Sequence, residues 1–298
     1  MSKLSPSLKA LINAPSARPG PVGAPQGMRD VYERIAADAA RKKLGTRPWL
    51  AISAAATFTL NSPDSLAILH GVASADRGIV AATQTAELMR DVGLKCISFN
   101  GIPRTINCLN AFRAALPPAL AAALSTTPER ALTPHNLDAV LARGRRLFDS
   151  VYAPLADKLV DRLARAHPDL PVHILASHYA PLLADPPLPP PSPAADAVAA
   201  ARTGRLLTSA VAVACLRAQT GVGPQVLSHV YGLRKAVDDG SWRAGWVGER
   251  RDEADEEELV RWLAGDEGSE WILKTVDSIV EALGGSSFAA GPGRQSKL

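Results

Sequence analysis

Apolar residues recur along most of this chain at the spacing of an α-helix. In residues 28–43, the side chains of Val31, Ile35 and Ala39 fall on one helical face. Residues 49–60 are apolar and rich in alanine, which is typical of a helix buried on all sides. The alternation of apolar and polar residues that marks a β-strand is almost absent. The pattern therefore predicts an all-α fold.

Glycine and proline divide this pattern into separate helices. A helix over residues 83–99 ends at the break around Gly101, and the next helix has Pro103 in its first turn, where the missing N–H costs nothing. We expect the other helices at residues 63–69, 104–115, 145–166, 201–218 and 225–237, with a further helical segment after the acidic residues 252–258.

The chain divides into an arm, a helical domain and a tail. Residues 1–28 are rich in Pro, Ser, Gly and Ala and predict a flexible arm. The tail, residues 284–298, is rich in Gly and Ser and is expected to be flexible as well. The helical domain covers residues 29–283, with halves at 29–144 and 145–283 and a stiff Pro-rich linker at 181–193.

The composition is that of a globular protein. Of the 298 residues, 47% are hydrophobic and 21% are charged, which excludes a disordered chain. No uninterrupted apolar run reaches the roughly 18–20 residues that a membrane helix needs, so we expect no membrane span. The three cysteines, Cys96, Cys108 and Cys215, are too few and too scattered for a disulfide framework, which favours a reducing compartment.

The net charge of +4 comes from residues 1–29, which are the arm and the first residue after it. Residues 1–29 hold four basic residues and no acid, and the other 29 Lys and Arg residues balance the 29 acids. Aromatic residues make up only 5% of the chain, and no stripe of Lys and Arg interleaved with them is present. Nucleic acid is therefore not expected as a partner.

The last three residues match a targeting signal, which predicts where in the cell the protein is located. Ser296, Lys297 and Leu298 form the C-terminal tripeptide that a peroxisomal import receptor reads. We therefore expect the peroxisome matrix as the location and that receptor as a partner. The alternative is the mitochondrion, because the acid-free arm contains Ser and Arg like a presequence. Prolines from Pro15 onward would break any amphipathic helix there.

A weak internal repeat is visible. A helix, a Gly/Pro break and a second helix occur at residues 87–115 and again at 203–236. Aligning Pro103 with Pro224 places Cys108 against His229. The repeat predicts two similar helical halves around a pseudo-twofold axis.

The residues that most favour a catalytic function follow the second Gly/Pro break, at residues 221–224. After a Gly turn at residues 221–223, Gln225 and His229 stand four residues apart, on one face of the expected helix. This arrangement resembles the carboxymuconolactone decarboxylase and alkyl hydroperoxidase D (AhpD)-like superfamily. The resemblance covers residues 45–240 and implies an AhpD-like all-α fold of two repeated halves that assembles into homo-oligomers.

The resemblance also limits the chemistry. Redox members of the superfamily use a Cys-x-x-Cys before the histidine and a glutamate on the preceding helix. Here Val222 and Gln225 stand at the cysteine positions, and the glutamate position falls near Ala210. Without the thiols, dithiol peroxide reduction is not expected at this site. The decarboxylase branch, which has Gln and His, is more similar.

Three functional hypotheses follow. The first is a cofactor-independent enzyme acting on a small acid or lactone, with His229 as general acid and base and Gln225 orienting it or the ligand. In this hypothesis Arg104 and Asn107, at the equivalent site of the first half, bind the substrate. The second is a scaffold or binding protein that has lost the chemistry, in which His229 is structural. The enzyme requires His229 to line a closed polar pocket, whereas the scaffold predicts that side chains fill it.

The third hypothesis is a thiol antioxidant. Arg104 and Cys108 are four residues apart, and a nearby guanidinium lowers the pKa of a thiol. This function requires an exposed Cys108 with a lowered pKa; otherwise Cys108 is a core residue. No metal site is expected, because His173 and His178, five residues apart, lie on different faces of an α-helix. No cofactor is expected either, since phosphate-loop and dinucleotide motifs are absent.

Overall fold

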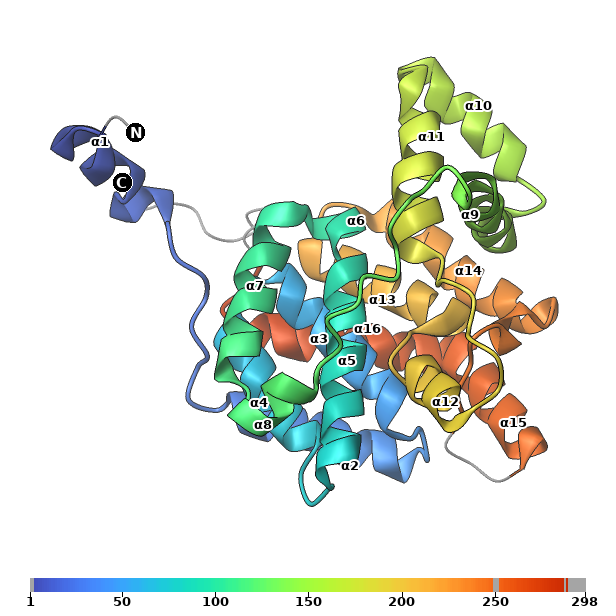
Figure 1. Cartoon of the computed structure of the whole chain (residues 1–298), viewed down its shortest axis with the longest axis horizontal. Coiled ribbons are helices and arrows are strands. Elements are labelled where there is room, and N and C mark those ends of the chain that lie inside the picture. Colours follow the sequence, from blue (N-terminus) through green and yellow to red (C-terminus); the bar gives the residue numbers. More distant parts are fainter. Residues whose placement is uncertain (1–2, 249–251, 287, 289–298) are drawn as a thin grey trace.

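The computed structural model describes residues 3–248, 252–286 and 288, and it confirms the all-α fold: these residues contain helices and no strand (Figure 1). The α-helices are α1 (Pro6–Ile12), α2 (Met28–Arg41), α3 (Thr46–Thr59), α4 (Pro63–Ala73), α5 (Ile79–Lys95), α6 (Ile97–Asn100), α7 (Ile102–Ala115), α8 (Pro118–Ala123), α9 (Leu137–Tyr152), α10 (Ala156–Ala166), α11 (Asp169–His173), α12 (Pro193–Ala200), α13 (Gly204–Gln219), α14 (Gly223–Asp238), α15 (Glu253–Ala264) and α16 (Asp266–Ala282). A π-helix, η2 (Ile174–Leu183), continues α11, and η1 (Pro15–Ala17) and η3 (Ser241–Arg243) are short 3-10 helices.

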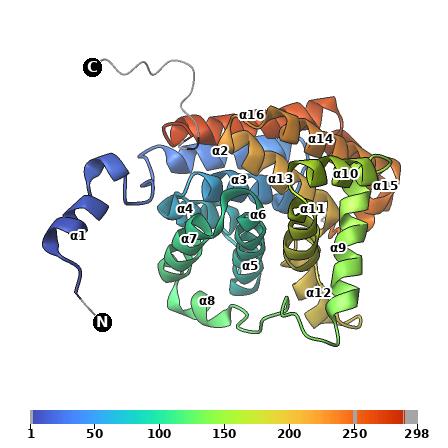
Figure 2. The same ribbon diagram turned by 90° about the horizontal axis from the view of Figure 1, so that it is seen from above.

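Two buried helices form the centre of the molecule. Nearly every residue of α3 and of α13 is buried, as expected for helices that are apolar all round. They pack against each other, with α16 and α2 on one side and α5 and α7 on the other (Figure 2). Small side chains on both helices allow this close approach.

The hydrophobic core joins the two predicted halves. Phe58 and Phe112 belong to the same cluster of buried residues as Leu206 and Ile272. A second, smaller cluster lies around Phe148, between α9 and η2. The division into repeated halves is therefore not confirmed.

The two helix junctions that suggested the repeat do share one local feature. Gly101, before α7, has φ 79° and ψ 167°, and Thr220, after α13, has φ 66° and ψ 164°. This left-handed conformation suits glycine but strains threonine.

The expected helix at 145–166 is wrong. Pro154 divides it into α9 and α10, because proline lacks the N–H that a helix interior needs and disfavours helical geometry at Ala153. The expected helix at 83–99 is likewise divided, with α5 ending at Lys95 and α6 beginning at Ile97.

The Pro-rich segment is shorter than expected. Residues 184–192 connect two helices, but Pro181 lies inside η2 and Pro193 begins α12. The π-helix packs closely on α9, since a Cβ placed on Gly144 would lie 2.3 Å from the Cα of Ala180. This contact fixes α9 beside the connecting segment.

The arm contains more structure than its composition predicts. Helix α1 begins where Pro6 follows Ser5, whose hydroxyl accepts a hydrogen bond from the N–H of Leu8. No residue of α1 is buried, and the helix lies apart from the body (Figure 1). The expected targeting residues Ser296, Lys297 and Leu298 lie outside the described residues.

One stretch is long and apolar enough to cross a membrane by length and composition alone. It covers residues 193–219, and 78% of its most apolar window is buried in the fold. The break between α12 and α13, where Gly204 has φ 66°, interrupts the stretch. A central core helix meets the same criteria, so the stretch is weak evidence for a membrane span.

Candidate functional site

His229 lies inside the protein rather than in an open pocket. It belongs to α14 and is only 7% exposed, with Phe99 and Tyr152 packed edge-on against its ring. Its Nε2 lies 3.3 Å from the hydroxyl of Tyr152, which in turn accepts a hydrogen bond from Tyr179. Its Nδ1 is buried and forms no hydrogen bond with any of the described residues.

The surroundings of His229 keep its ring neutral. Burial, and then the positive charge of Arg205, lower its pKa to about 4. The imidazole is therefore uncharged at neutral pH. A neutral ring whose Nδ1 has no partner is held in place mainly by packing and by the hydroxyl of Tyr152.

The cavity beside His229 is very small. Its volume is about 10 Å³, and its lining is largely apolar: Phe99, Leu147, Val151, Tyr179, Leu183, Thr208, Ser209, Ala212 and His229. This is about the room that one water molecule needs. Side chains thus fill the site, which is the condition set for a structural His229, and a small acid or lactone does not fit.

Gln225 does not reach His229. Its side chain is exposed, whereas His229 is buried. The hydroxyl of Tyr152 occupies the orienting position instead. The sequence spacing correctly places both residues on one helix, but α9 covers the inner residue and leaves the outer one in solvent.

The residues predicted in the first half are buried or already engaged. Cys108 is 0% exposed, and burial raises its pKa to about 12, although the charge of Arg104 opposes this. The guanidinium of Arg104 donates to the carbonyl of Thr59 and stacks 3.7 Å from the ring centre of Phe288. Asn107 is exposed, 3.4 Å from the side chain of Asn61. The exposed, acidic thiol that the antioxidant hypothesis requires is therefore not found.

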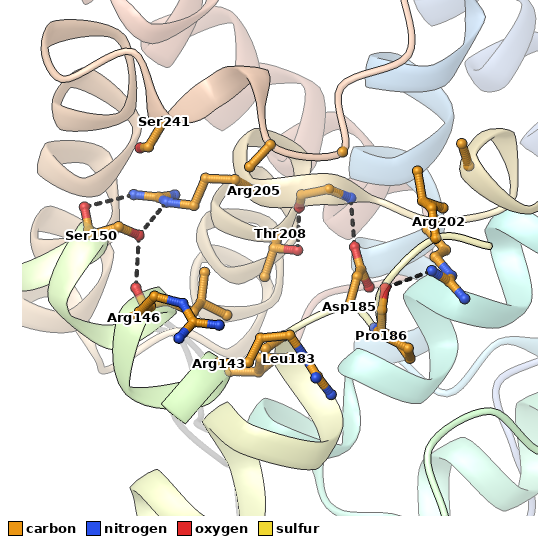
Figure 3. Close-up of a pocket in the computed structure, with 17 residues that line it drawn as sticks. Arg143, Arg146, Ser150, Leu183, Asp185, Pro186, Arg202, Arg205, Thr208 and Ser241 are labelled. Atoms are coloured by element: carbon orange, nitrogen blue, oxygen red, sulfur yellow. Dashed lines mark hydrogen bonds between the residues drawn. The ribbon is translucent and has the colours of Figure 1, made fainter. Parts of the chain in front are cut away.

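A larger cleft adjoins the small cavity beside His229. Its volume is about 450 Å³, and it shares Leu147, Leu183 and Thr208 with the small cavity. Four arginines line it, Arg143 and Arg146 on α9, Arg202 before α13 and Arg205 on α13 (Figure 3). Its apolar walls are formed mainly by Leu147, Leu183, Ala184, Pro186, Leu188 and Ala199.

The cleft's one acidic residue is fully engaged. Asp185 accepts hydrogen bonds from Lys95 at 2.7 Å, from Arg130 at 3.0 Å and from the N–H of Gly204 at 2.8 Å. Burial alone would raise its pKa, but the charges of Lys95 and Arg130 outweigh this and hold the pKa at about 2. Asp91 completes a charge-neutral quartet with these residues, 2.7 Å from Arg130 and 3.6 Å from Lys95.

Two of the cleft arginines are held by the protein. Arg205 donates to Ser150, Ser209 and the carbonyl of Gly232, none of which is charged. Burial lowers its pKa to about 10, so it remains protonated at neutral pH. Arg202 pairs with Glu129 at 2.9 Å and donates to the carbonyl of Pro186.

The other two arginines have no partner. In the described part of the chain, the guanidinium groups of Arg143 and Arg146 make no hydrogen bond or ion pair with another side chain, and the Nε of Arg143 is buried and unsatisfied. Burial, and then repulsion from Arg130 and Arg146, lower the pKa of Arg143. The cleft therefore holds uncompensated positive charge, which favours an anion.

Sequence reasoning missed this cleft. Arg143 and Arg146 stand three residues apart on α9, which puts them on one helical side, and Arg202 and Arg205 flank the start of α13. The two pairs are separated by more than fifty residues, and arginines on amphipathic helices usually face solvent. Only the tertiary fold, in which α9 packs on η2 and α14 and Ser150 accepts hydrogen bonds from Arg205, brings the two pairs together.

Comparisons with protein-family models, with curated proteins and with solved structures found no match. The resemblance to the AhpD-like superfamily therefore stays a prediction from the sequence.

Proposed function

We propose that this protein binds small organic anions in the arginine-lined cleft. One observation carries the proposal: the unpartnered guanidinium groups of Arg143 and Arg146 face a 450 Å³ cleft whose carboxylate, Asp185, is already neutralised. Bringing two cations together without an anion is unfavourable, and a bound anion relieves that repulsion. The proposal develops the binding-protein hypothesis rather than the antioxidant one.

The cleft also suits the carbon skeleton of such a ligand. Its volume lies within the roughly 300–1,000 Å³ that is usual for small-molecule sites. Leucine, proline and alanine side chains form most of its walls, and the planar guanidinium groups match carboxylate or phosphate oxygens in pairs. The expected ligand is an organic acid with an apolar part and one or more carboxylate or phosphate groups.

Calorimetric titration with a panel of mono-, di- and tricarboxylic acids and phosphate esters tests this proposal, with inorganic phosphate as the control for charge alone. A charged hydrogen bond contributes about 1.5–3 kcal/mol, so the double variant R143Q/R146Q should bind any hit at least about tenfold more weakly. The matched control is R162Q/R165Q on α10, which removes the same charge outside the cleft lining. Equal weakening by both double variants, or no weakening by either, would contradict the proposal.

A blocking variant separates shape from charge. Ala199 lines the cleft on α12, and A199F would place a ring in it while every arginine remains. We expect loss of binding of the organic acids with unchanged secondary structure by circular dichroism. Retained binding would place the ligand elsewhere on the protein.

A second candidate, acid–base catalysis by His229 on the bound acid, is favoured by one observation. The His229 cavity and the cleft share Leu147, Leu183 and Thr208, so a movement of these side chains would join the two spaces. In that case H229Q should still bind the acid but no longer convert it, as followed by mass spectrometry. Recovery of every bound acid unchanged from the wild-type protein would eliminate this candidate.

A further inference from the structure

Two histidines that an α-helix would separate lie side by side here. His173 ends α11 and His178 belongs to the π-helix η2 that continues it. Their ring centres are 5.1 Å apart, and the ring planes are inclined by 81°. In an α-helix, residues five apart point in different directions, whereas the i→i+5 hydrogen bonding of a π-helix brings them to the same side. The two rings therefore do not lie on different faces, as α-helical geometry would predict for residues five apart.

A serine hydroxyl holds the same nitrogen on each ring. Nδ1 of His173 lies 3.0 Å from Oγ of Ser177, and Nδ1 of His178 lies 3.1 Å from Oγ of Ser98 on α6. Within the described residues, no hydrogen bond is formed by Nε2 of either ring. Histidines that bind metals are commonly oriented in this way, with one nitrogen hydrogen-bonded and the other free to bind.

We propose that His173 and His178 form a binding site for a divalent transition-metal ion. Two imidazoles bound to one tetrahedral ion, with nitrogen–metal distances of about 2.0–2.1 Å, place their ring centres roughly 5 Å apart, in agreement with the observed spacing. His173 is exposed and His178 half-buried, so the ion has access from solvent.

The donor set defines the class of ion. Among the described residues, no third histidine, cysteine or carboxylate joins the pair, so water completes the coordination. Imidazole nitrogen suits Cu²⁺, Ni²⁺ and Zn²⁺ and does not suit Mg²⁺ or Ca²⁺, which prefer oxygen.

Calorimetry on the full chain without a histidine tag tests the site. We expect one Cu²⁺ per chain, bound more tightly than Ni²⁺ or Zn²⁺, and no heat from Mg²⁺. H173A and H178A should each weaken Cu²⁺ binding at least about tenfold, because one imidazole then remains. H135A is the matched control, since His135 is also exposed and lies outside this pair. The proposal would be overturned if the double variant H173A/H178A bound Cu²⁺ as tightly as the wild type. An equal loss of Cu²⁺ affinity in H135A would also overturn it.

A second readout requires no substitution. Zn²⁺ should protect His173 and His178 of the unmodified protein from diethyl pyrocarbonate, as read by mass spectrometry, and should leave His135 reactive. Equal modification of His173 and His178 with and without Zn²⁺ would also overturn the proposal. The result does not depend on the arginine cleft, because neither histidine lines it.

Discussion

The His229 cavity and the arginine cleft lie next to each other and differ in almost every property that makes a site. The cavity holds a residue with catalytic potential but has a volume of about 10 Å³, whereas the cleft has a volume of about 450 Å³ and holds no histidine or cysteine. His229 is neutral and packed by aromatic rings, while the guanidinium groups of Arg143 and Arg146 have no partner in the part of the chain that the structure describes. The comparison teaches that reactive residue types do not mark a site unless space adjoins them.

The largest effect is expected at the ionic quartet of Lys95, Asp91, Arg130 and Asp185, through which Asp185 is held at the cleft. Lys95 is 0% exposed, and K95M would leave Asp91 and Asp185 sharing Arg130 as their one close cation. Breaking a buried ion pair from one side costs about 3–5 kcal/mol. Urea unfolding should show that loss, and anion binding should weaken because the negative charge of Asp185 would lose the compensating charge of Lys95. K158M, at an exposed position on α10, should change stability little; a K95M protein as stable as K158M would show that the quartet does not stabilise the fold.

The next effect concerns the neutral His229. Its folded pKa of about 4 lies below the unfolded value near 6.5, so the unfolded chain binds the proton more readily between these pH values. Stability should therefore fall as pH is lowered from about 6.5 to about 4, by up to about 3 kcal/mol from this residue.

H229Q should make the free energy of unfolding depend less on pH. Some dependence should remain, because burial also lowers the pKa values of His70 and His178. Asp185 contributes mainly below pH 4, because its stabilisation is lost as pH falls from its unfolded pKa near 3.9 toward its folded pKa of about 2. Urea unfolding from pH 7 to pH 4 measures the slope, and identical slopes in wild type and H229Q would mean that His229 is not held neutral by burial.

The smallest effects distinguish the two residues that compete to orient His229. Y152F removes the hydroxyl that contacts both His229 and Tyr179, and should cost about 1 kcal/mol. Q225A removes an exposed amide and should change stability by less than about 0.5 kcal/mol. The reverse order in thermal unfolding would restore Gln225 to the role that the sequence predicts.

Much of the fold follows from local pattern. The all-round apolar character of residues 49–60 predicts α3, and Gly101 with Pro103 predicts the start of α7. The break at Pro154 was also available from the sequence, because proline rarely occupies a helix interior. The hydrophobic periodicity continues on both sides of Pro154 and therefore favours one long helix when it is considered alone.

The candidate sites depend on three-dimensional geometry that the hydrophobic periodicity of the sequence does not reveal. The π-helical turn between His173 and His178 has no clear sequence signature, and it reverses the argument about their faces. The arginine cleft depends on α9 lying against η2 through Gly144, a contact between residues far apart in sequence. Conversely, residue type and spacing favour Cys108 and His229 as reactive groups, but burial removes their access to solvent.

The most direct test of the central claim is a crystal structure of the protein soaked in selenate, whose anomalous signal locates a bound anion. The account predicts the strongest selenium peak in the cleft, within hydrogen-bond distance of the guanidinium groups of Arg143 and Arg146, and no peak beside His229. A cleft without selenium, with the anion bound elsewhere or in an opened His229 cavity, would contradict it.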